Sequence, residues 1–202
     1  MANPKLYYTT TSCGAANYIA ATRCGIKFDS EKVDLGTGKT ESGGDFEAIN
    51  WKGSVPALVF PDGSVLSENV AILTWINDNA VNKWGPESGT PAWFEMINNL
   101  AYVNSTIHAG FGQIYNAQTE EDKVRARAKL TEQLGWMIKF GTKGGKFLGS
   151  QFTVADIYAY ICLSWASWMG LTLDEPVEAY FKGIQAIDGV GSVYQAINTP
   201  AN

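Results

Sequence analysis

The chain has 202 residues, of which 46% are hydrophobic and 17% are charged, and its formal net charge is −5. These values are typical of a globular protein with one large core or two smaller ones. Its Lys and Arg residues are scattered, which argues against a nucleic-acid partner. The most apolar stretch, residues 157–173, is too short for a bilayer span and contains Ser and Gly, so it predicts a core helix and no membrane association.

The N-terminal segment has the pattern of a βαβ unit. "KLYY" at residues 5–8 and "FDSEKVDL" at residues 28–35 predict two strands. Between them the sequence predicts a helix from about Cys13 to Cys24, which Gly25 would close as the residue after the C-cap.

The following segment predicts a hairpin and another helix. Residues 36–50 are rich in Gly, Ser, Thr and Asp and predict a surface loop with a short helical turn near Phe46. "PALVF" at 56–60 and "SVLSE" at 64–68 flank the turn sequence "PDG" and predict an antiparallel hairpin. Apolar residues then recur at helical spacing, at Val70, Leu73 and Ile76.

A change in composition predicts a domain boundary. The stretch "NDNAVNKWGPESGTP" at 77–91 is loaded with Asn, Gly and Pro, and no strand pattern follows it. We therefore expect one domain at 1–79, a linker at 80–91 and an all-helical domain at 92–202.

The second half has helical periodicity. Thr153 and Asp156 in "TVAD" match the reciprocal capping pattern at a helix start. Trp93, Ile97, Leu100 and Ile107 recur with helical spacing and predict one helix. Further helices are predicted at about 120–140, 153–168 and 176–183.

Ser12 and Cys13 lie where the first strand meets the first helix. A thiol in a first helical turn has its pKa lowered from about 8.5 toward neutrality, which favours a reactive thiolate. Cys13 also fits as a small packed residue, because the run Cys-Gly-Ala-Ala lacks a CxxC partner. Ser12 could donate a hydrogen bond to a ligand thiolate, or it could be a plain N-cap.

A second candidate site is the helix start in "SENVAI". With Ser67 as N-cap, the free N–H groups behind it would hold an anion, and Glu68 would hold a cation. An α-amino acid carries a carboxylate and an ammonium side by side, so it would fit an anion site next to a cation site. An ordinary helix start with an acidic first turn explains the same residues.

Together these motifs resemble the cytosolic glutathione transferases over nearly the whole chain. The resemblance is carried by "SVPAL" before the third strand, "LSENVAI" at the next helix and "FTVADIY" in the second half. Cys13 and "TIHAGFGQIY" make the beta class of bacteria and its fungal relatives the most similar group. The resemblance implies an α+β fold, with a thioredoxin-like βαβ–ββα domain before an all-helical domain. It also implies glutathione as co-substrate in the cleft between them, no metal, and a homodimer.

The resemblance also implies roles for single residues. The backbone of Val55, before a cis Pro56, would pair with the cysteinyl part of glutathione. Glu68 would bind the γ-glutamyl ammonium, and the backbone N–H of Asn69 would bind the γ-glutamyl carboxylate. Lys39 would meet the glycyl carboxylate.

Further candidates lie on either side of the boundary. His108, the only histidine, is implied to lie near the ligand, although a structural role is equally compatible with a lone histidine. Tyr8 stands roughly where other classes carry a catalytic Tyr, and it also reads as strand core. The aromatic candidates for the wall of the electrophile pocket, which core packing explains equally well, are Phe111, Tyr115, Trp165 and Trp168.

The implied reaction is attack by the glutathione thiolate on a small electrophile or on a disulfide sulfur. Cys13 would donate its S–H to that thiolate, or form a mixed disulfide that supports thiol transfer or peroxidase activity. The alternative is a non-catalytic glutathione-binding or regulatory protein on the same scaffold. Cys13, Cys24 and Cys162 lack metal-ligand spacing, which predicts free thiols in the cytoplasm.

Overall fold

The computed structural model describes residues 2–82 and 84–199. The chain forms two compact units. Unit 1 contains the chain up to Gly85 together with the segment from Asp188 onward, and unit 2 contains Pro86–Ile187.

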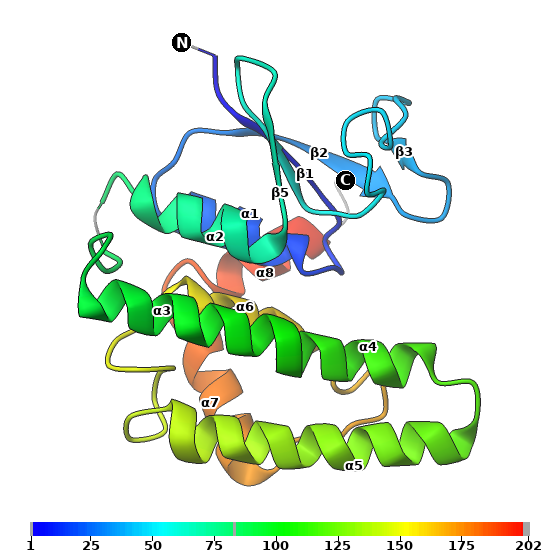
Figure 1. The fold of residues 1–202 in the computed structure, drawn as a ribbon, viewed down its shortest axis with the longest axis vertical. Helices are drawn as coiled ribbons and strands as arrows, with labels where there is room; N and C mark the ends of the chain where they lie inside the picture. Colours follow the sequence, from blue (N-terminus) through cyan, green and yellow to red (C-terminus); the bar gives the residue numbers. More distant parts are fainter. Residues whose placement is uncertain (1, 83, 200–202) are drawn as a thin grey trace. The chain divides into compact units, whose positions relative to one another are not determined.

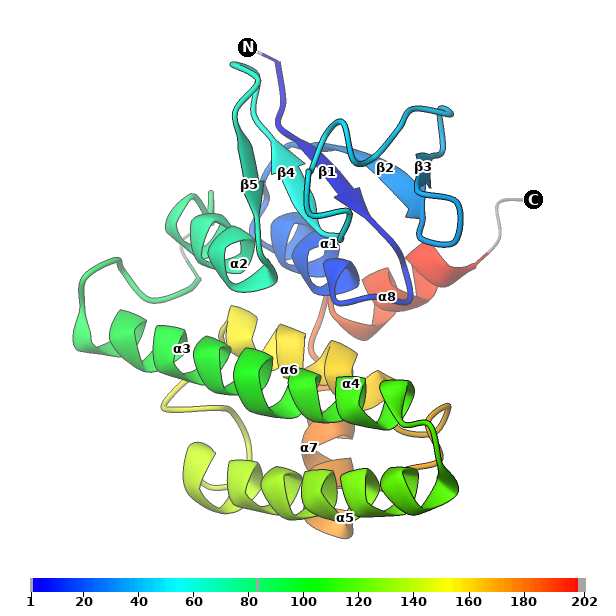
Figure 2. The same cartoon turned by 45° about the vertical axis from the view of Figure 1, so that its right-hand side comes forward.

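Unit 1 is built on a five-stranded mixed sheet of order β3-β2-β1-β4-β5 (Figures 1 and 2). β1 runs parallel to β2, and the other neighbouring strands pair antiparallel. Helices α1 and α2 lie on one face of this sheet. The predicted βαβ–ββα order is confirmed, and β3 is a short addition within the predicted loop. The elements are β1 (Lys5–Tyr8), α1 (Gly14–Arg23), β2 (Asp29–Asp34), β3 (Lys39–Thr40), β4 (Ala57–Val59), β5 (Val65–Ser67) and α2 (Asn69–Asp78).

Small side chains allow α1 to approach its neighbours closely. Ala15, Ala16 and Ala20 are fully buried, together with Ile19. The helix ends as predicted, because Gly25 adopts a φ of 70°, which is costly for a residue with a Cβ. The start of this helix, where the candidate residues lie, is therefore held against the sheet.

The last helix, α8 (Gly191–Asn198), belongs to unit 1 and contacts α1. The Arg23 side chain donates a hydrogen bond to the carbonyl of Asp188, and Val190 is fully buried. This grouping differs from the expected helical domain at 92–202, because the chain after residue 187 returns to the first unit. Contacts between residues so far apart in sequence leave no periodic signal.

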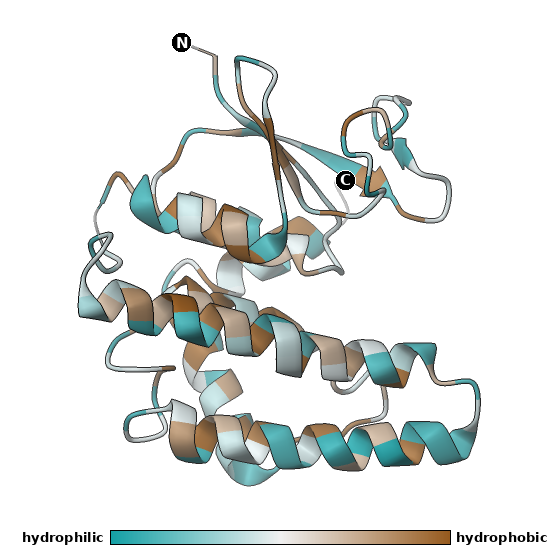
Figure 3. Ribbon diagram, viewed as in Figure 1, coloured by the Kyte–Doolittle hydropathy of each residue, from teal (hydrophilic) through white to brown (hydrophobic). Residues whose placement is uncertain are grey.

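Unit 2 is helical, as the sequence predicts. α6 forms its core, since ten of its eleven residues are buried. The apolar segment 157–173 was expected to be a core helix, and α6 covers only its first part, because the helix ends at Ser164 and turns follow. Figure 3 shows α5 as largely hydrophilic along its length. No helix in the described part of the chain is both long and apolar enough to cross a bilayer. The elements are α3 (Pro91–Tyr102), the π-helical η1 (Val103–His108), α4 (Ala109–Asn116), α5 (Glu120–Trp136), the π-helical η2 (Met137–Gly141), α6 (Val154–Ser164) and α7 (Glu175–Gln185).

The predicted capping box at the start of α6 is confirmed. The N–H of Thr153 donates to the Asp156 carboxylate at 2.8 Å, and the Thr153 hydroxyl accepts from the N–H of Ala155 at 3.2 Å. The same carboxylate accepts from the N–H of Leu148 at 2.7 Å and from the Tyr180 hydroxyl at 2.8 Å. Burial raises the pKa of Asp156 to about 6, and these donors oppose that rise. Asp156 therefore ties the loop before α6 to α7.

Candidate functional site

Ser12 stabilises the turn that leads from β1 into α1. Its hydroxyl donates to the carbonyl of Thr9 at 3.0 Å and accepts from the N–H of Gly14 at 3.1 Å. The proton that could serve a ligand thiolate is thus engaged within the turn, which favours a structural role for Ser12. The N-cap of α1 is Cys13, one position later than the sequence suggested.

Cys13 is the N-cap of α1, and its side chain is turned inward. It is 8% exposed, and its Sγ lies 3.9 Å from the carbonyl oxygen of Val55, to which the S–H donates. Burial raises the pKa of the Cys13 thiol to about 12. The N–H groups of Cys13 and Gly14 act in the opposite direction, and the charge of Glu68 adds to the rise. The predicted lowering of this pKa is wrong, because desolvation outweighs the helix N-terminus.

The Cys13 contact joins the helix start to the segment before β4. The Val55–Pro56 peptide bond is cis, as the resemblance implied. Pro56 is buried, and β4 begins at the next residue. The backbone of Val55 is therefore fixed beside the thiol of Cys13.

Glu68 connects β5 to α2 with an unusual backbone. Its φ is 80° and its ψ is 122°, and it is the one non-glycine residue with positive φ in the described ranges 2–82 and 84–199. Glu68 is the N-cap of α2, whereas the sequence predicted Ser67, which instead ends β5. The first helical hydrogen bond runs from the N–H of Ile72 to the Glu68 carbonyl at 3.1 Å. The earlier N–H groups of α2 have no partner within the helix, as at any helix start. Strained residues of this kind cluster at functional sites.

Sequence reasoning missed Lys52. Its ammonium lies 2.6 Å from a carboxylate oxygen of Glu68, whose side chain is 65% exposed. Lys52 lies only three residues before Val55, but its approach to Glu68 depends on the β4–β5 hairpin. A Lys just before the "SVPAL" motif was the only available signal.

Asn69 points into the unit. It is 5% exposed, and its Oδ1 accepts a hydrogen bond from Nδ2 of Asn17 on α1. Its own Nδ2 has no hydrogen-bond partner among the described residues. The side chain therefore links α2 to α1, and a ligand at the helix start would meet the backbone N–H.

In unit 2, His108 belongs to a hydrogen-bonded chain. Its Nδ1 lies 2.5 Å from the hydroxyl of Tyr158, which also lies 3.0 Å from Oδ1 of Asn104. Its ring packs edge-on against Trp165, with ring centroids 5.1 Å apart. Burial lowers the pKa of His108 below its usual 6.5, so the ring is neutral at pH 7. Its position in a π-helical turn is common at functional sites.

The four aromatic candidates differ in exposure, and Trp165 is half-buried between His108 and Phe111. Phe111 is fully buried and packs edge-on against Trp165, so Phe111 is core and was wrongly expected to line a pocket. Tyr115 and Trp168 are 67% and 72% exposed, and their ring centroids are 6.0 Å apart. Both line a pocket of about 340 Å³ in unit 2.

Comparison with known proteins identifies the family. Residues 17–79 match the family model "Glutathione S-transferase, N-terminal domain". The chain is 32% identical to glutathione S-transferase GstA of Escherichia coli O157:H7, over 88% of this chain and 90% of that protein. The chain belongs to the glutathione S-transferase family.

Two solved structures of glutathione S-transferases extend the likeness to the whole fold. A sphingomonad glutathione S-transferase complexed with glutathione has a TM-score of 0.89 and 30% identity, covering 97% of this chain and 100% of that chain. A bacterial beta-class glutathione S-transferase from Sphingomonas chungbukensis has a TM-score of 0.87 and 33% identity, covering 96% and 98%. The resemblance to beta-class glutathione transferases is confirmed, and so is the thioredoxin-like fold of the N-terminal half.

Two of the expected glutathione transferase residues do not join the cluster of Cys13, Val55 and Glu68. Tyr8 is 3% exposed and stacks on Tyr18 at 5.0 Å, and burial raises the pKa of Tyr8 to about 12. The strand-core interpretation of Tyr8 is therefore the better one. Lys39 is exposed on β3, and its ammonium lies 4.0 Å from the carboxylate of Asp45.

Proposed function

We propose that this glutathione transferase binds its co-substrate on unit 1, along the backbone of Val55 and the start of α2. The observation that carries the proposal is the convergence of Cys13, Val55 and Glu68. Cys13 contacts the Val55 carbonyl at 3.9 Å, and the charge of Glu68 acts on the Cys13 thiol. An extended peptide can pair with a strand-like backbone there, while its charged end reaches the helix.

The two charges of the γ-glutamyl group fit the start of α2. Its carboxylate would accept from the free N–H of Asn69, where the helix dipole also favours an anion. Its ammonium would bind the carboxylate of Glu68, whose present partner is Lys52. Lys52 would then be released from Glu68 toward a carboxylate of the ligand, a role that Lys39 would share at the glycyl end.

Cys13 acts in this proposal as a protonated donor. With its pKa near 12 the thiol keeps its proton at pH 7, so it is a poor nucleophile itself. Its S–H makes only a long contact of 3.9 Å with the Val55 carbonyl, and it would turn from there to donate to the glutathione thiolate. Ser12 helps by stabilising the turn between β1 and α1. Conjugation of small electrophiles is thus the main reaction. Thiol transfer or peroxide reduction through Cys13 is the second candidate, since Cys24 and Cys162 are fully buried and Cys13 is not.

Unit 2 supplies the other substrate in this proposal. The exposed rings of Tyr115 and Trp168 would receive the apolar part of the electrophile, and Trp165 would hold the ring of His108 in place. As in the family generally, the active form would be a homodimer. The buried free thiols of Cys13, Cys24 and Cys162 fit a cytoplasmic enzyme.

The test combines binding and turnover. Calorimetry should show saturable binding of glutathione at or below millimolar concentration. Turnover with an aryl chloride, a mixed disulfide and an organic hydroperoxide then separates the reactions. Cys13→Ser should keep aryl chloride conjugation within about tenfold, since the cost of one hydrogen bond is ~0.5–1.5 kcal/mol, and should lose disulfide exchange. Sedimentation at micromolar concentration should show a dimer. Binding without any turnover would support the regulatory alternative.

A further inference from the structure

The pocket beside Tyr115 and Trp168 contains an arginine with an uncompensated charge. Arg127 on α5 is half-buried, and its Nε donates to the carbonyl of Met169 at 3.0 Å. Among the described residues Arg127 forms no ion pair. Its terminal nitrogens thus lack the carboxylate partner that a guanidinium in a partly dry site normally has.

The guanidinium is also held in place. Gly170 has a φ of 66°, and a Cβ added there would lie 3.0 Å from Nη2 of Arg127. The side chain therefore lies close against the backbone of residues 169–170, anchored through its Nε. A planar fork fixed at one nitrogen presents its other N–H groups in a defined direction, which suits bidentate recognition of a carboxylate or sulfonate.

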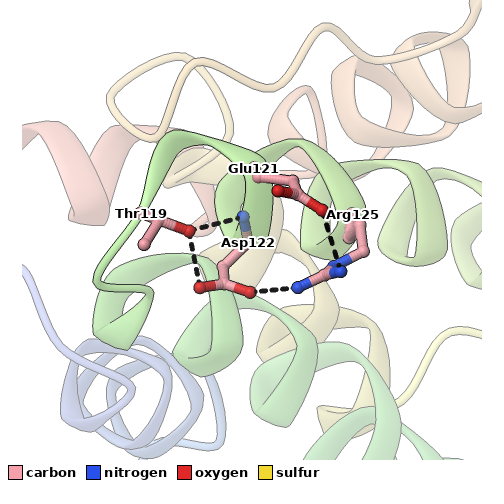
Figure 4. Close-up of polar contacts among 4 residues, drawn as sticks. All are labelled: Thr119, Glu121, Asp122 and Arg125. Carbon is pink, nitrogen blue, oxygen red and sulfur yellow. Dashed lines mark hydrogen bonds and ion pairs between the residues drawn. The ribbon is translucent and has the colours of Figure 1, made fainter.

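The neighbouring arginine on the same helix shows the opposite arrangement. Arg125 bonds the carboxylates of Glu121 and Asp122, and Thr119 in turn bonds Asp122 (Figure 4). Its charge is neutralised at the helix surface. Two residues along the helix, Arg127 faces the pocket with no such partner.

The other charges at the pocket do not cancel Arg127. Lys123 also lines it, and its ammonium lies 2.7 Å from Glu120. Glu120 is the carboxylate on which Arg127 acts at longer range, and its side chain is 77% exposed. Glu120 is thus shared with Lys123 and solvated, which leaves one positive charge in excess at the pocket.

The aromatic residues determine the rest of the ligand. Tyr115 and Trp168 are tilted by 34° with ring centroids 6.0 Å apart, so they form an open aromatic surface and leave no slot between them. Such rings bury little of their apolar surface in the free protein, and they bury much more when the ring of a ligand stacks on them. The pocket volume of about 340 Å³ suits a molecule of one or two rings.

We propose that this pocket binds a planar aromatic anion, with the ring on Tyr115 and Trp168 and the carboxylate or sulfonate on Arg127. When the bound anion is itself the electrophile that glutathione attacks, this inference rests on the proposed function. It then names the substrate class, which is aromatic electrophiles that carry a negatively charged group. Neutral aromatics of the same shape bind more weakly, because they leave Arg127 without a partner.

The experiment compares two probes that differ in charge alone. The full-length protein is titrated with naphthalenesulfonate and with naphthalenesulfonamide, and calorimetry measures the dissociation constant of each probe. The sulfonate should bind about tenfold more tightly or better, as expected for a hydrogen bond to a charged group. Arg127→Gln should remove that preference. Arg125→Gln is the matched control, because it changes the net charge equally on the same helix, and it should change the dissociation constant less than twofold.

The aromatic surface is tested in the same way. Trp168→Ala should lower the affinity for both probes by about tenfold, because an aromatic stacking contact and the burial of apolar surface are lost. Trp51→Ala is its control, since Trp51 is 84% exposed and belongs to unit 1. Equal affinities of the two probes, equal losses in Arg127→Gln and Arg125→Gln, or an unchanged affinity in Trp168→Ala would each overturn the inference.

Kinetics separate this inference from the proposed function. Arg127→Gln should raise the KM for a chloronitrobenzoate about tenfold relative to the KM for the matching benzamide. If the protein prefers the sulfonate but shows no glutathione-dependent turnover, the transferase proposal fails and the anion site stands. If it conjugates neutral aryl chlorides without any sulfonate preference, the anion site fails alone.

Discussion

Glu68 allows strain and binding to be measured separately. Glu68→Ala and Glu68→Gly both remove the carboxylate that we assign to the γ-glutamyl ammonium. The two variants differ only in the Cβ, which is costly at the φ of 80° and ψ of 122° that this position adopts. The difference between them therefore reports the backbone, and their common loss reports the carboxylate.

The expected magnitudes follow from the geometry. A residue held in a sparsely populated backbone region costs ~1–3 kcal/mol. Glycine loses ~0.5–1 kcal/mol more chain entropy than alanine on folding. Glu68→Gly should thus be more stable than Glu68→Ala by about 0.5–2 kcal/mol. The exposed pair with Lys52 is worth ~0–1 kcal/mol and is lost in both variants, so it cancels. Glutathione affinity should fall in both by about 10- to 150-fold, which corresponds to ~1.5–3 kcal/mol.

Thermal unfolding and calorimetry measure the two effects. Each kcal/mol corresponds to about 2–4 °C in Tm for a chain of this size. Glu132 is an exposed residue inside α5 and serves as the control, where Glu132→Gly should be less stable than Glu132→Ala by about 1 kcal/mol. If the order of stability at position 68 matches that at position 132, Glu68 is not strained. An unchanged dissociation constant for glutathione would remove Glu68 from the site.

Two further predictions concern titration. Because burial holds the pKa of Cys13 near 12, its alkylation by iodoacetamide in the free protein, measured by mass spectrometry, should keep rising through pH 10, and a plateau between pH 6 and 8 would contradict the burial argument. The protonation midpoint of His108, followed by nitrogen-detected NMR on the only histidine, should lie below pH 6.5. Since the pKa of His108 is lower in the folded than in the unfolded protein, its contribution to stability is lost as the pH falls below 6.5. A midpoint above 6.5 would contradict the burial argument for His108.

Most of the fold could be predicted because its signals are local. The Cys13–Gly25 helix, the "PDG" hairpin and the Thr153–Asp156 capping box each depend on residues a few positions apart. The return of α8 to unit 1 could not be predicted, because it depends on a contact between Arg23 and Asp188. The capping residue of α2 was misplaced by one position, since Glu68 adopts a backbone conformation that sequence statistics disfavour.

The structure adds contacts to the candidate site that the sequence could not supply, while the roles of its residues toward glutathione stay predictions. Cys13 contacts the carbonyl of Val55, before the cis Pro56, and the charge of Glu68 acts on its thiol. The partnership of Lys52 with Glu68 and the burial of Phe111 are products of packing, and neither has a local pattern. The same holds for Tyr8, whose strand position predicted both a catalytic hydroxyl and a core side chain, and whose exposure decides for the core.

The protonation state of Cys13 depends on two opposing effects, the helix N-terminus and burial, and the sequence alone does not show which is larger. A helix N-terminus stabilises a nearby anion by ~0.3–2 kcal/mol, and one pKa unit equals about 1.4 kcal/mol. Burial alone can shift a pKa by ~3–5, so a thiol at a helix start becomes acidic only if it also faces solvent. Cys13 faces the Val55 carbonyl instead and keeps its proton. The reactive sulfur anion of a conjugation reaction is then the one that glutathione brings, and the protonated Cys13 is the donor that we propose for it.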